Sequence, residues 1–283
     1  MKRTHTCGQL RPEQAGQTVT LTGWVNSRRD LGGVVFIDLR DREGRTQVVI
    51  NPNQDPRLGD LAKPVREEWV VTVSGTVKAR PEDMVNKNLA TGGIEIEVSA
   101  LEIENKARPM PYNLDDPLTS EEIKLKYRYL DMRRSSLGEN LRLRHKVAKI
   151  TRDYMDEHAF TEVETPILSK STPEGARDYL VPSRVWPGQF YALPQAPQQY
   201  KQILMVAGVE RYFQIAKCFR DEDLRADRQP EFTQIDIEMS FIDEQDIYDL
   251  VEGLLARILK GTRDLDIQLP FQRLSYQEAM DRY

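Results

Sequence analysis

Residues 219–232 read FRDEDLRADRQPEF, a charged segment that separates two apolar ones. The segment before it, residues 212–216, is mostly apolar. After it, apolar residues recur at every second position: Ile235, Ile237, Met239 and Phe241. Two apolar runs on either side of a polar stretch are typical of two strands joined by a long loop. The sequence therefore predicts a β-hairpin with an unusually charged connection.

The side chains of this loop suit the recognition of an anion. Arginine makes planar, two-pronged contacts with phosphate or carboxylate groups. Arg220 and Glu222 are two positions apart at the end of the first strand, so both are expected on one face of the sheet. Phe232 begins the second strand and offers an aromatic ring. These groups fit a nucleotide, although a surface hairpin whose charges pair in water would have the same pattern.

A resemblance favours the nucleotide. Phe219-Arg220-x-Glu222, followed by Arg228-x-x-x-Phe232, resembles motif 2 of the class II aminoacyl-tRNA synthetases. The longer string FRDEDLRADRQPEFTQID, residues 219–236, is similar almost residue for residue to the bacterial aspartyl-tRNA synthetases. The resemblance implies an α+β fold, with an N-terminal five-stranded OB-fold β-barrel followed by a partial class II catalytic domain built on an antiparallel sheet.

The composition is that of an ordinary soluble protein. The chain has 283 residues, 30% charged and 39% hydrophobic, which is enough for two domains. The net charge of -5 gives no global basic field. Residues 124–152 are locally basic, with ten Lys and Arg against two acids. This run predicts either a solvated helix surface or a contact with an RNA backbone.

Cysteine usage and hydropathy indicate the compartment. Cys7 and Cys218 are far apart, and no Cys-x-x-Cys or His cluster occurs, so we expect no disulfide framework and no metal site. The first residues lack the apolar core of a signal peptide, and no stretch has transmembrane length. The sequence predicts a cytoplasmic protein that does not associate with membranes.

Five strand-like runs with Gly-rich turns between them occupy the first 105 residues. Short strands at this density predict a small closed barrel, with the OB-fold as the leading candidate. Gly23 and Gly75 fall inside strands and are expected at bends or bulges. The predicted strands are 19–25, 34–39, 46–50, 70–77 and 94–101.

The barrel carries candidate RNA contacts. An aromatic residue on an OB sheet can stack on an unpaired base, and a glutamine can read a base edge. Strand alternation alone places Phe36 in the core, whereas the resemblance implies that it faces the anticodon of tRNA-Asp. The implied anticodon residues are Arg29, Phe36, Gln47, Arg80 and Glu95. Two positions are linked to tRNA discrimination: Leu31 favours strict selection of tRNA-Asp, and Asp83 matches neither expected pattern.

Residues 106–118 are rich in Pro, Asn and Asp, which predicts a hinge. The predicted domains are therefore residues 1–105, the anticodon-binding barrel, and residues 119–283, the N-terminal part of a catalytic domain. Thr119 and Glu122 form the pattern of a capping box that begins a helix through Leu130. A second helix is expected over residues 141–158, which resembles the long helix of motif 1.

Residues 160–168 form an extended apolar run that contains Pro166. Proline cannot donate a hydrogen bond to a neighbouring strand, so the run predicts an edge or interface strand. By itself, the pattern fits a simple strand end. The resemblance implies that this is the motif 1 strand and that Pro166 packs at the interface of a homodimer.

A loop at 169–177, a short strand at 190–193 and a helix that follows Pro197 come next. Gln198 and Lys201 are expected on one face of that helix, where a lone Lys is usually solvated. The resemblance instead implies an aspartate site. Ala196 departs from the family's usual Ser, so a hydroxyl contact is not expected there. The implied L-aspartate-binding residues are Glu174, Gln198, Gln199, Tyr200, Lys201, Arg220 and Asp236.

The resemblance also assigns the chemistry. Aspartate would attack the α-phosphorus of ATP, and the adenylate would then acylate the 3′ end of tRNA-Asp. Such a reaction depends on positioning and charge neutralisation. The implied catalytic residues are Arg220, which would hold the α-phosphate, and Glu222, which would orient ATP or the terminal adenosine, with Mg²⁺ bridging ATP phosphates. The implied ATP-binding residues are Arg220, Asp221, Glu222, Arg228, Gln229 and Phe232.

The end of the chain predicts an amphipathic helix at 243–259 capped by Asp243, then a short strand and a helix that begins at Ser275. The family's Gly-rich third motif is not found, since Gly253 and Gly261 are the only glycines after Phe232. We therefore expect the N-terminal part of a longer enzyme, which alone neither folds its C-terminal half well nor activates aspartate efficiently. The alternatives are a non-catalytic tRNA-binding or regulatory paralogue, and a synthetase for asparagine or lysine.

Overall fold

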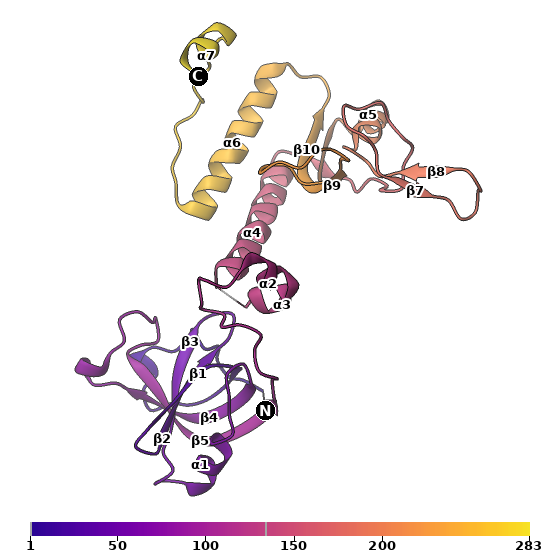
Figure 1. The fold of residues 1–283 in the computed structure, drawn as a ribbon. Helices are drawn as coiled ribbons and strands as arrows, with labels where there is room; N and C mark the ends of the chain where they lie inside the picture. Colours follow the sequence, from indigo (N-terminus) through magenta and orange to yellow (C-terminus); the bar gives the residue numbers. More distant parts are fainter. Residues whose placement is uncertain (1, 134) are drawn as a thin grey trace. The chain divides into compact units, whose positions relative to one another are not determined.

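The computed structural model describes residues 2–133 and 135–283, so Arg134 of the basic run lies outside the described residues. The chain forms two compact units, Met1–Glu139 and Asn140–Tyr283 (Figure 1). Each unit has its own apolar core. The domain limits expected from the sequence, 1–105 and 119–283, remain predictions.

The first unit contains a closed five-stranded barrel, as predicted. Every strand has two neighbours in the order β1-β2-β3-β5-β4. All pairs are antiparallel except β3 with β5, which is parallel. The strands extend the predicted ones by a few residues: β1 (Thr18–Leu31), β2 (Val34–Arg40), β3 (Arg45–Ile50), β4 (Val70–Ala79) and β5 (Ile94–Asn105).

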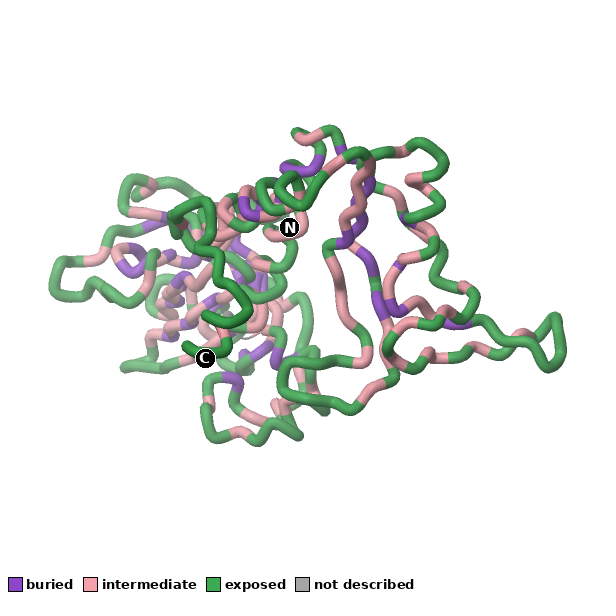
Figure 2. Tube along the Cα trace, turned by 90° about the horizontal axis from the view of Figure 1, so that it is seen from above, coloured by how far each residue is buried: buried purple, intermediate pink, exposed green. Residues whose placement is uncertain are grey.

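Buried and partly exposed residues alternate along the barrel strands (Figure 2). The buried set, largely Val, Ile and Leu, forms one continuous core. Gly75 lies at an irregularity between β4 and β5, as predicted. Gly23 has a different role, because a Cβ there would lie 2.4 Å from the carbonyl oxygen of Arg40. It permits close approach of two backbones.

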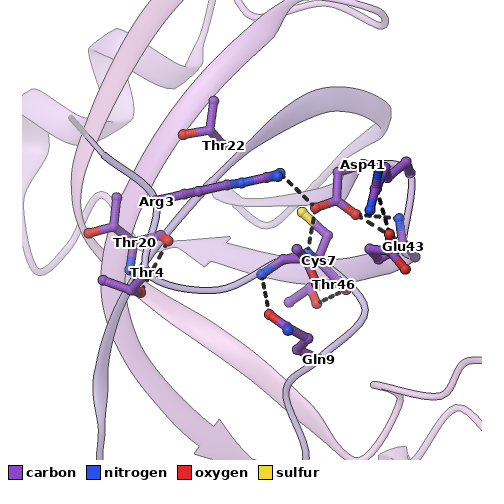
Figure 3. Close-up of polar contacts among 12 residues, drawn as sticks. Arg3, Thr4, Cys7, Gln9, Thr20, Thr22, Asp41, Glu43 and Thr46 are labelled. Atoms are coloured by element: carbon purple, nitrogen blue, oxygen red, sulfur yellow. Dashed lines mark hydrogen bonds and ion pairs between the residues drawn. The ribbon is translucent and has the colours of Figure 1, made fainter.

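The segment before β1 is fastened to the barrel by Asp41 (Figure 3). The buried Asp41 carboxylate accepts hydrogen bonds from Cys7 N at 2.9 Å and from Arg3 at 3.2 Å. The Thr46 hydroxyl donates to Cys7 O at 2.6 Å. Burial, followed by the charge of Asp41, raises the pKa of the Cys7 thiol. Cys7 is therefore a neutral core residue. The short helices of this region are η1 (Pro12–Gln14), α1 (Pro56–Ala62) and η2 (Glu82–Met84).

Glu68 joins the barrel to the segment that follows it. Its buried carboxylate accepts two hydrogen bonds from Arg40, at 2.8 and 3.0 Å, and one from Arg133 at 2.6 Å. The Arg133 guanidinium also lies over the Trp24 ring, 5.2 Å from its centroid. Residues 106–120 contain no helix or strand.

The predicted capping box at Thr119 is wrong by one residue. The N-cap is Ser120, whose hydroxyl accepts from Ile123 N at 3.4 Å. The helix that was expected to continue through Leu130 is interrupted at Tyr127, whose ψ of 44° is not helical. It forms two short helices, α2 (Glu121–Lys126) and α3 (Arg128–Asp131).

The second unit is built on a three-stranded sheet in the order β10-β9-β6. The predicted hairpin is confirmed as β9 (Arg211–Phe219) and β10 (Glu231–Met239), which are antiparallel. Helices α4 (Ser135–Glu157) and α6 (Glu244–Arg263) pack against one sheet face through Tyr154, Met155, Leu250 and Leu254. The other face is free of these helices and carries the polar residues described below.

One expected strand is shorter than predicted and another is wrong. The run 160–168 forms an edge strand as predicted, but only over β6 (Thr161–Glu162), which pairs in parallel with β9, and Pro166 lies beyond it. No strand forms among residues 267–274, although Ser275 caps a helix as predicted. The remaining elements are β7 (Leu180–Pro182), β8 (Phe190–Ala192), α5 (Gln198–Val206) and α7 (Tyr276–Arg282). None of the described helices could span a membrane.

Candidate functional site

The β9–β10 register determines which side chains share the free sheet face. Phe232 is opposite Cys218, Asp236 is opposite Gln214, and Glu238 is opposite Tyr212. Residues directly opposite each other on neighbouring strands point to the same face. The intervening residues Phe213, Ile237 and Met239 belong to the helix-covered core. The chain therefore separates an apolar face from a polar one by simple alternation.

At one end of the polar face, the β9–β10 loop encloses a cavity of about 390 Å³. The Arg220 guanidinium lies over the Phe232 ring, with its Cζ 4.9 Å from the ring centroid. Arg228 donates to Glu222 at 3.2 Å. Five of the six predicted ATP-binding residues line the cavity: Arg220, Glu222, Arg228, Gln229 and Phe232. Asp221 does not; its backbone N–H donates to Arg177 O at 3.0 Å.

Further along the same face, Lys201 is buried between two carboxylates. Its side chain reaches from α5 to the sheet, where Nζ donates to Asp236 Oδ1 at 2.8 Å and lies 3.3 Å from Glu238 Oε2. Burial by itself would lower the pKa of Lys201. The hydrogen bond that Lys201 donates to Asp236 and the charges of Asp236 and Glu238 outweigh it, so the pKa is raised and the ammonium stays charged.

One atom of this cluster has no partner. Asp236 Oδ2 is buried and has no partner at full hydrogen-bond geometry, but the buried Tyr212 hydroxyl acts on the same carboxylate: burial, followed by the charge of Asp236, raises the pKa of Tyr212. A buried carboxylate oxygen is normally satisfied, and an unpaired one costs free energy. An ammonium group that enters the site would supply the missing donor. The site thus offers a fixed cation, Lys201, and a free acceptor beside it.

Cys218 is a buried residue of the polar sheet face, opposite Phe232. Its thiol donates to Gln234 at 3.2 Å. Burial, followed by the charge of Asp236, raises the pKa of Cys218 to about 11, and the charges of Arg220, Glu174 and Lys201 also act on it. The four predicted charged residues Glu174, Lys201, Arg220 and Asp236 therefore lie close enough to act on one buried thiol, although up to 62 positions separate them in the sequence. Their role in binding aspartate remains a prediction.

The remaining predicted aspartate residues have different surroundings. Gln198 is partly buried at the first position of α5, one turn before Lys201, so the predicted shared helix face is confirmed. Gln199 is exposed. The Tyr200 hydroxyl lies 3.1 Å from Ser169 Oγ. Pro166 is exposed and lines a separate cavity of about 430 Å³ with residues of β9.

Sequence reasoning missed two residues of this site. Glu238 shares Lys201 with Asp236 and lies two positions further along β10. Its place on the polar face could have been found from strand alternation alone. Gln195 is buried and holds the loop that contains Glu174. A lone Gln between two prolines gives no such signal.

The predicted anticodon residues lie on the outer face of the barrel. Phe36 is partly exposed and lies opposite Arg29 in the β1–β2 register. Arg29 donates to Gln47 Oε1 at 3.1 Å, and Gln47 Nε2 donates to Glu95 at 3.1 Å. Arg80 Nε is 3.5 Å from the same Glu95 carboxylate. Four of the five residues thus form one connected polar network.

The two positions linked to tRNA discrimination lie near loops. Leu31 is exposed at the end of β1, just before the tight turn at Gly32 and Gly33, which have φ of 61° and 87°. Asp83 is exposed in η2. Their role remains a prediction. Among the described residues, no three His, Cys, Asp or Glu side chains are arranged to hold a metal ion.

Comparison with known families agrees with this geometry. Residues 120–283 match the family described as tRNA synthetases class II (D, K and N). The chain belongs to this family. Residues 19–105 match the family described as OB-fold nucleic acid binding domain. The predicted barrel and class II synthetase domain are therefore both confirmed.

Two curated relatives illustrate the similarity. The aspartate–tRNA ligase of Geobacillus kaustophilus is 57% identical over 284 residues, which cover 100% of this chain and 48% of the relative. The aspartate–tRNA(Asp/Asn) ligase of Desulfatibacillum aliphaticivorans is 55% identical with the same coverage. The chain of this class II synthetase thus spans about half the length of the curated relatives that it matches.

A solved structure shares the fold. The asparaginyl-tRNA synthetase of Pyrococcus horikoshii, complexed with asparaginyl-adenylate, superimposes with a TM-score of 0.86 at 26% identity. The match covers 99% of this synthetase chain and 67% of the other. A barrel and a synthetase-type sheet in this order along the chain are therefore already known from a class II synthetase.

Proposed function

We propose that this chain is the N-terminal part of an aspartate–tRNA ligase. The ligase would activate L-aspartate with ATP to aspartyl-adenylate and pyrophosphate, and then transfer aspartate to the 3′ end of tRNA-Asp. The observation that carries the proposal is the buried Lys201–Asp236 pair, with Asp236 Oδ2 unpartnered, on the sheet face that also carries the Arg220–Phe232 cavity. The names of the curated relatives favour aspartate as the amino acid.

The nucleotide would occupy the β9–β10 cavity. Adenine would stack on Phe232, and Arg220 would hold the α-phosphate where negative charge develops during attack by the aspartate carboxylate. Arg228 would reach the terminal phosphate, with Gln229 and Asp221 as further ATP contacts. Glu222, now paired with Arg228, would orient ATP or the terminal adenosine. Mg²⁺ would accompany ATP and be bound mainly by its phosphates, as is usual for this ion.

The aspartate would bind beside the nucleotide. Its ammonium group would donate to Asp236 Oδ2, with Glu174 and Gln198 completing the contact, while Gln199 and Tyr200 flank the site. Its side-chain carboxylate would pair with Lys201. A buried ammonium selects a carboxylate over an amide, because the neutral amide of asparagine cannot compensate a desolvated positive charge. Lys201 is therefore the proposed determinant of amino-acid specificity.

The test is amino-acid-dependent exchange of pyrophosphate into ATP by the complete gene product. We expect exchange with aspartate and little with asparagine or lysine. Lys201→Met should abolish the preference for aspartate over asparagine, a change of at least about 100-fold, since a site built around a polar partner rejects the unmatched analogue strongly. The matched control is Lys217→Met, on the exposed side of β9. A Lys201→Met enzyme with full preference for aspartate would refute the role.

The partners follow from the same proposal. The barrel would bind the anticodon of tRNA-Asp through Arg29, Phe36, Gln47, Arg80 and Glu95. Leu31 and Asp83 would influence how strictly tRNA-Asp is selected. The enzyme would act in the cytoplasm as a homodimer that forms through the motif 1 region, where Pro166 is exposed.

A further inference from the structure

Gln195 is a buried amide side chain near the proposed aspartate site. It lies between β8 and α5 and is 2% exposed. A buried amide must find partners for its N–H groups and its oxygen, because an unsatisfied group in the interior costs free energy. The hydrogen-bond partners of Gln195 therefore indicate its structural role.

All of these partners lie in one loop. Ala176 N donates to Gln195 Oε1 at 3.0 Å. Gln195 Nε2 donates to Ala176 O at 2.9 Å and to Asp178 Oδ1 at 2.5 Å. The side-chain amide therefore pairs with the backbone of Ala176 on both its donor and its acceptor side, as a neighbouring strand would.

This loop contains Glu174. It is held at its base by Gln195, by the Ser171 hydroxyl, which donates to Asp178 Oδ2 at 2.5 Å, and by Asp221 N, which donates to Arg177 O. Its apex is much less restrained. The Glu174 carboxylate has one hydrogen bond, from Thr172 at 3.1 Å, and no atom of another segment lies near Gly175.

We propose that Gln195 is a positioning residue for recognition of the substrate's ammonium group. By fixing Ala176, it sets the place of Glu174, two residues earlier, within reach of the Cys218 thiol on the polar sheet face. The inference rests on the proposed function. It adds that the Glu174 loop is anchored from beneath by one buried amide, and that ammonium recognition depends on this anchor.

The anchor affects only part of the substrate. The two carboxylates of aspartate would meet Arg220 and Lys201, which belong to the end of β9 and to α5 and not to the loop. The ammonium alone depends on the loop. Loss of the anchor should therefore weaken ligands that carry the ammonium group and spare those that lack it.

Succinate separates the two effects, since it has both carboxylates of aspartate and no ammonium group. In the complete gene product, Gln195→Met keeps the side-chain length and removes the amide. We expect the KM for aspartate in pyrophosphate exchange to rise about tenfold, as for the loss of one to two hydrogen bonds, and kcat to change less. The inhibition constant of succinate should stay within about twofold of the parent value. Gln202→Met, an exposed position on α5, is the matched control.

A double-mutant cycle strengthens the test. If Gln195 acts through Glu174, Gln195→Met should add little to the effect of Glu174→Gln, because both remove the same interaction. Full additivity would contradict the proposal. An equal rise in the aspartate KM and the succinate inhibition constant would also overturn it, since a merely structural role affects both ligands alike.

Two further measurements keep the test decisive. If Gln195→Met fails to fold, Gln195→Glu can replace it. This variant keeps the acceptor for Ala176 N–H but loses the two donated hydrogen bonds and places a carboxylate next to Asp178. The KM for aspartate should again rise while the inhibition constant of succinate stays unchanged. In the complete gene product, the Ala176 amide should lose its protection from hydrogen exchange in Gln195→Met, and unchanged protection would refute the anchor. A different result would reject the proposed function itself: exchange of pyrophosphate into ATP by the parent enzyme that does not depend on aspartate.

Discussion

One buried carboxylate, that of Glu68, connects the barrel to the segment that ends at Arg133. Three hydrogen bonds from two arginines neutralise it. Arg40 belongs to β2, whereas Arg133 lies 65 positions after Glu68 in sequence. A buried ion pair adds little stability compared with an apolar replacement, but removal of one member leaves the other charge uncompensated. The segment up to Arg133 is thus tied to the barrel by one carboxylate.

We expect Glu68→Ala to lower the free energy of unfolding by about 3 kcal/mol, because two partly buried guanidinium groups lose their counter-ion. Glu68 has a φ of 62°, but Ala and Glu are equally strained there, so the backbone term cancels. Urea denaturation followed by circular dichroism measures the change. Glu67→Ala, at the exposed neighbouring position, is the control. A loss no larger than that of the control would contradict the prediction.

The sequence pattern alone did not predict correctly whether every side chain of the candidate sites is buried or exposed. Phe36 lies in the apolar run 34–37, and the expectation from alternation alone, that its ring faces the core, is wrong. Asp38 and Arg40 share its parity and cannot be buried in an apolar core, so Val35, Ile37 and Leu39 point inward and Phe36 outward. Lys201 would be solvated on an isolated helix. It is buried because Asp236, from a distant strand, compensates its charge.

At the scale of the element, α6 has both strong end signals and a strong apolar face. Asp243 accepts hydrogen bonds from Gln245 N at 3.0 Å and Asp246 N at 3.4 Å, and Asp246 accepts from Asp243 N at 3.0 Å. Leu250 and Leu254 bury the helix against the sheet. The sequence therefore predicted this helix correctly, since its local and tertiary preferences agree.

Asp243→Ala should destabilise the second unit by about 1 kcal/mol, because two N-terminal amides of α6 lose their acceptor. The midpoint of urea denaturation, followed through the second unit, measures the change. Ser275→Ala removes the corresponding cap of α7, which has no buried residue, and should leave the midpoint nearly unchanged. Equal effects of the two substitutions would show that α6 does not depend on its cap.

The wrong elements have a common cause. The run 160–168 has the composition of a strand, but only Thr161 and Glu162 find partners, on β9. A strand exists only where a neighbour accepts and donates its backbone hydrogen bonds, and no local pattern contains that information. The break at Tyr127 between α2 and α3 is similar, since the residues there are compatible with a continuous helix.

At the scale of the whole molecule, the chain consists of two units that each have a core of their own. The barrel core contains residues from Cys7 to Leu101, and the second core contains residues from Tyr154 to Leu254. Each core is formed by side chains of its own unit. The proposed anticodon face and the proposed aspartate site therefore belong to separately stabilised parts, and each should respond to its own substitutions.

The separation predicts the RNA-binding behaviour of the 283-residue chain. Gln47→Ala should weaken binding of the tRNA-Asp anticodon stem-loop about 10- to 100-fold, the range expected for loss of a base contact, and leave the salt dependence unchanged. Lys201→Met should have no effect, because it acts in the other unit. Fluorescence anisotropy at several salt concentrations measures both. Arg57→Ala, on exposed α1, controls for loss of a surface charge. If Lys201→Met weakened RNA binding as much as Gln47→Ala, the two units would not be independent, and binding could no longer be assigned to the barrel face alone.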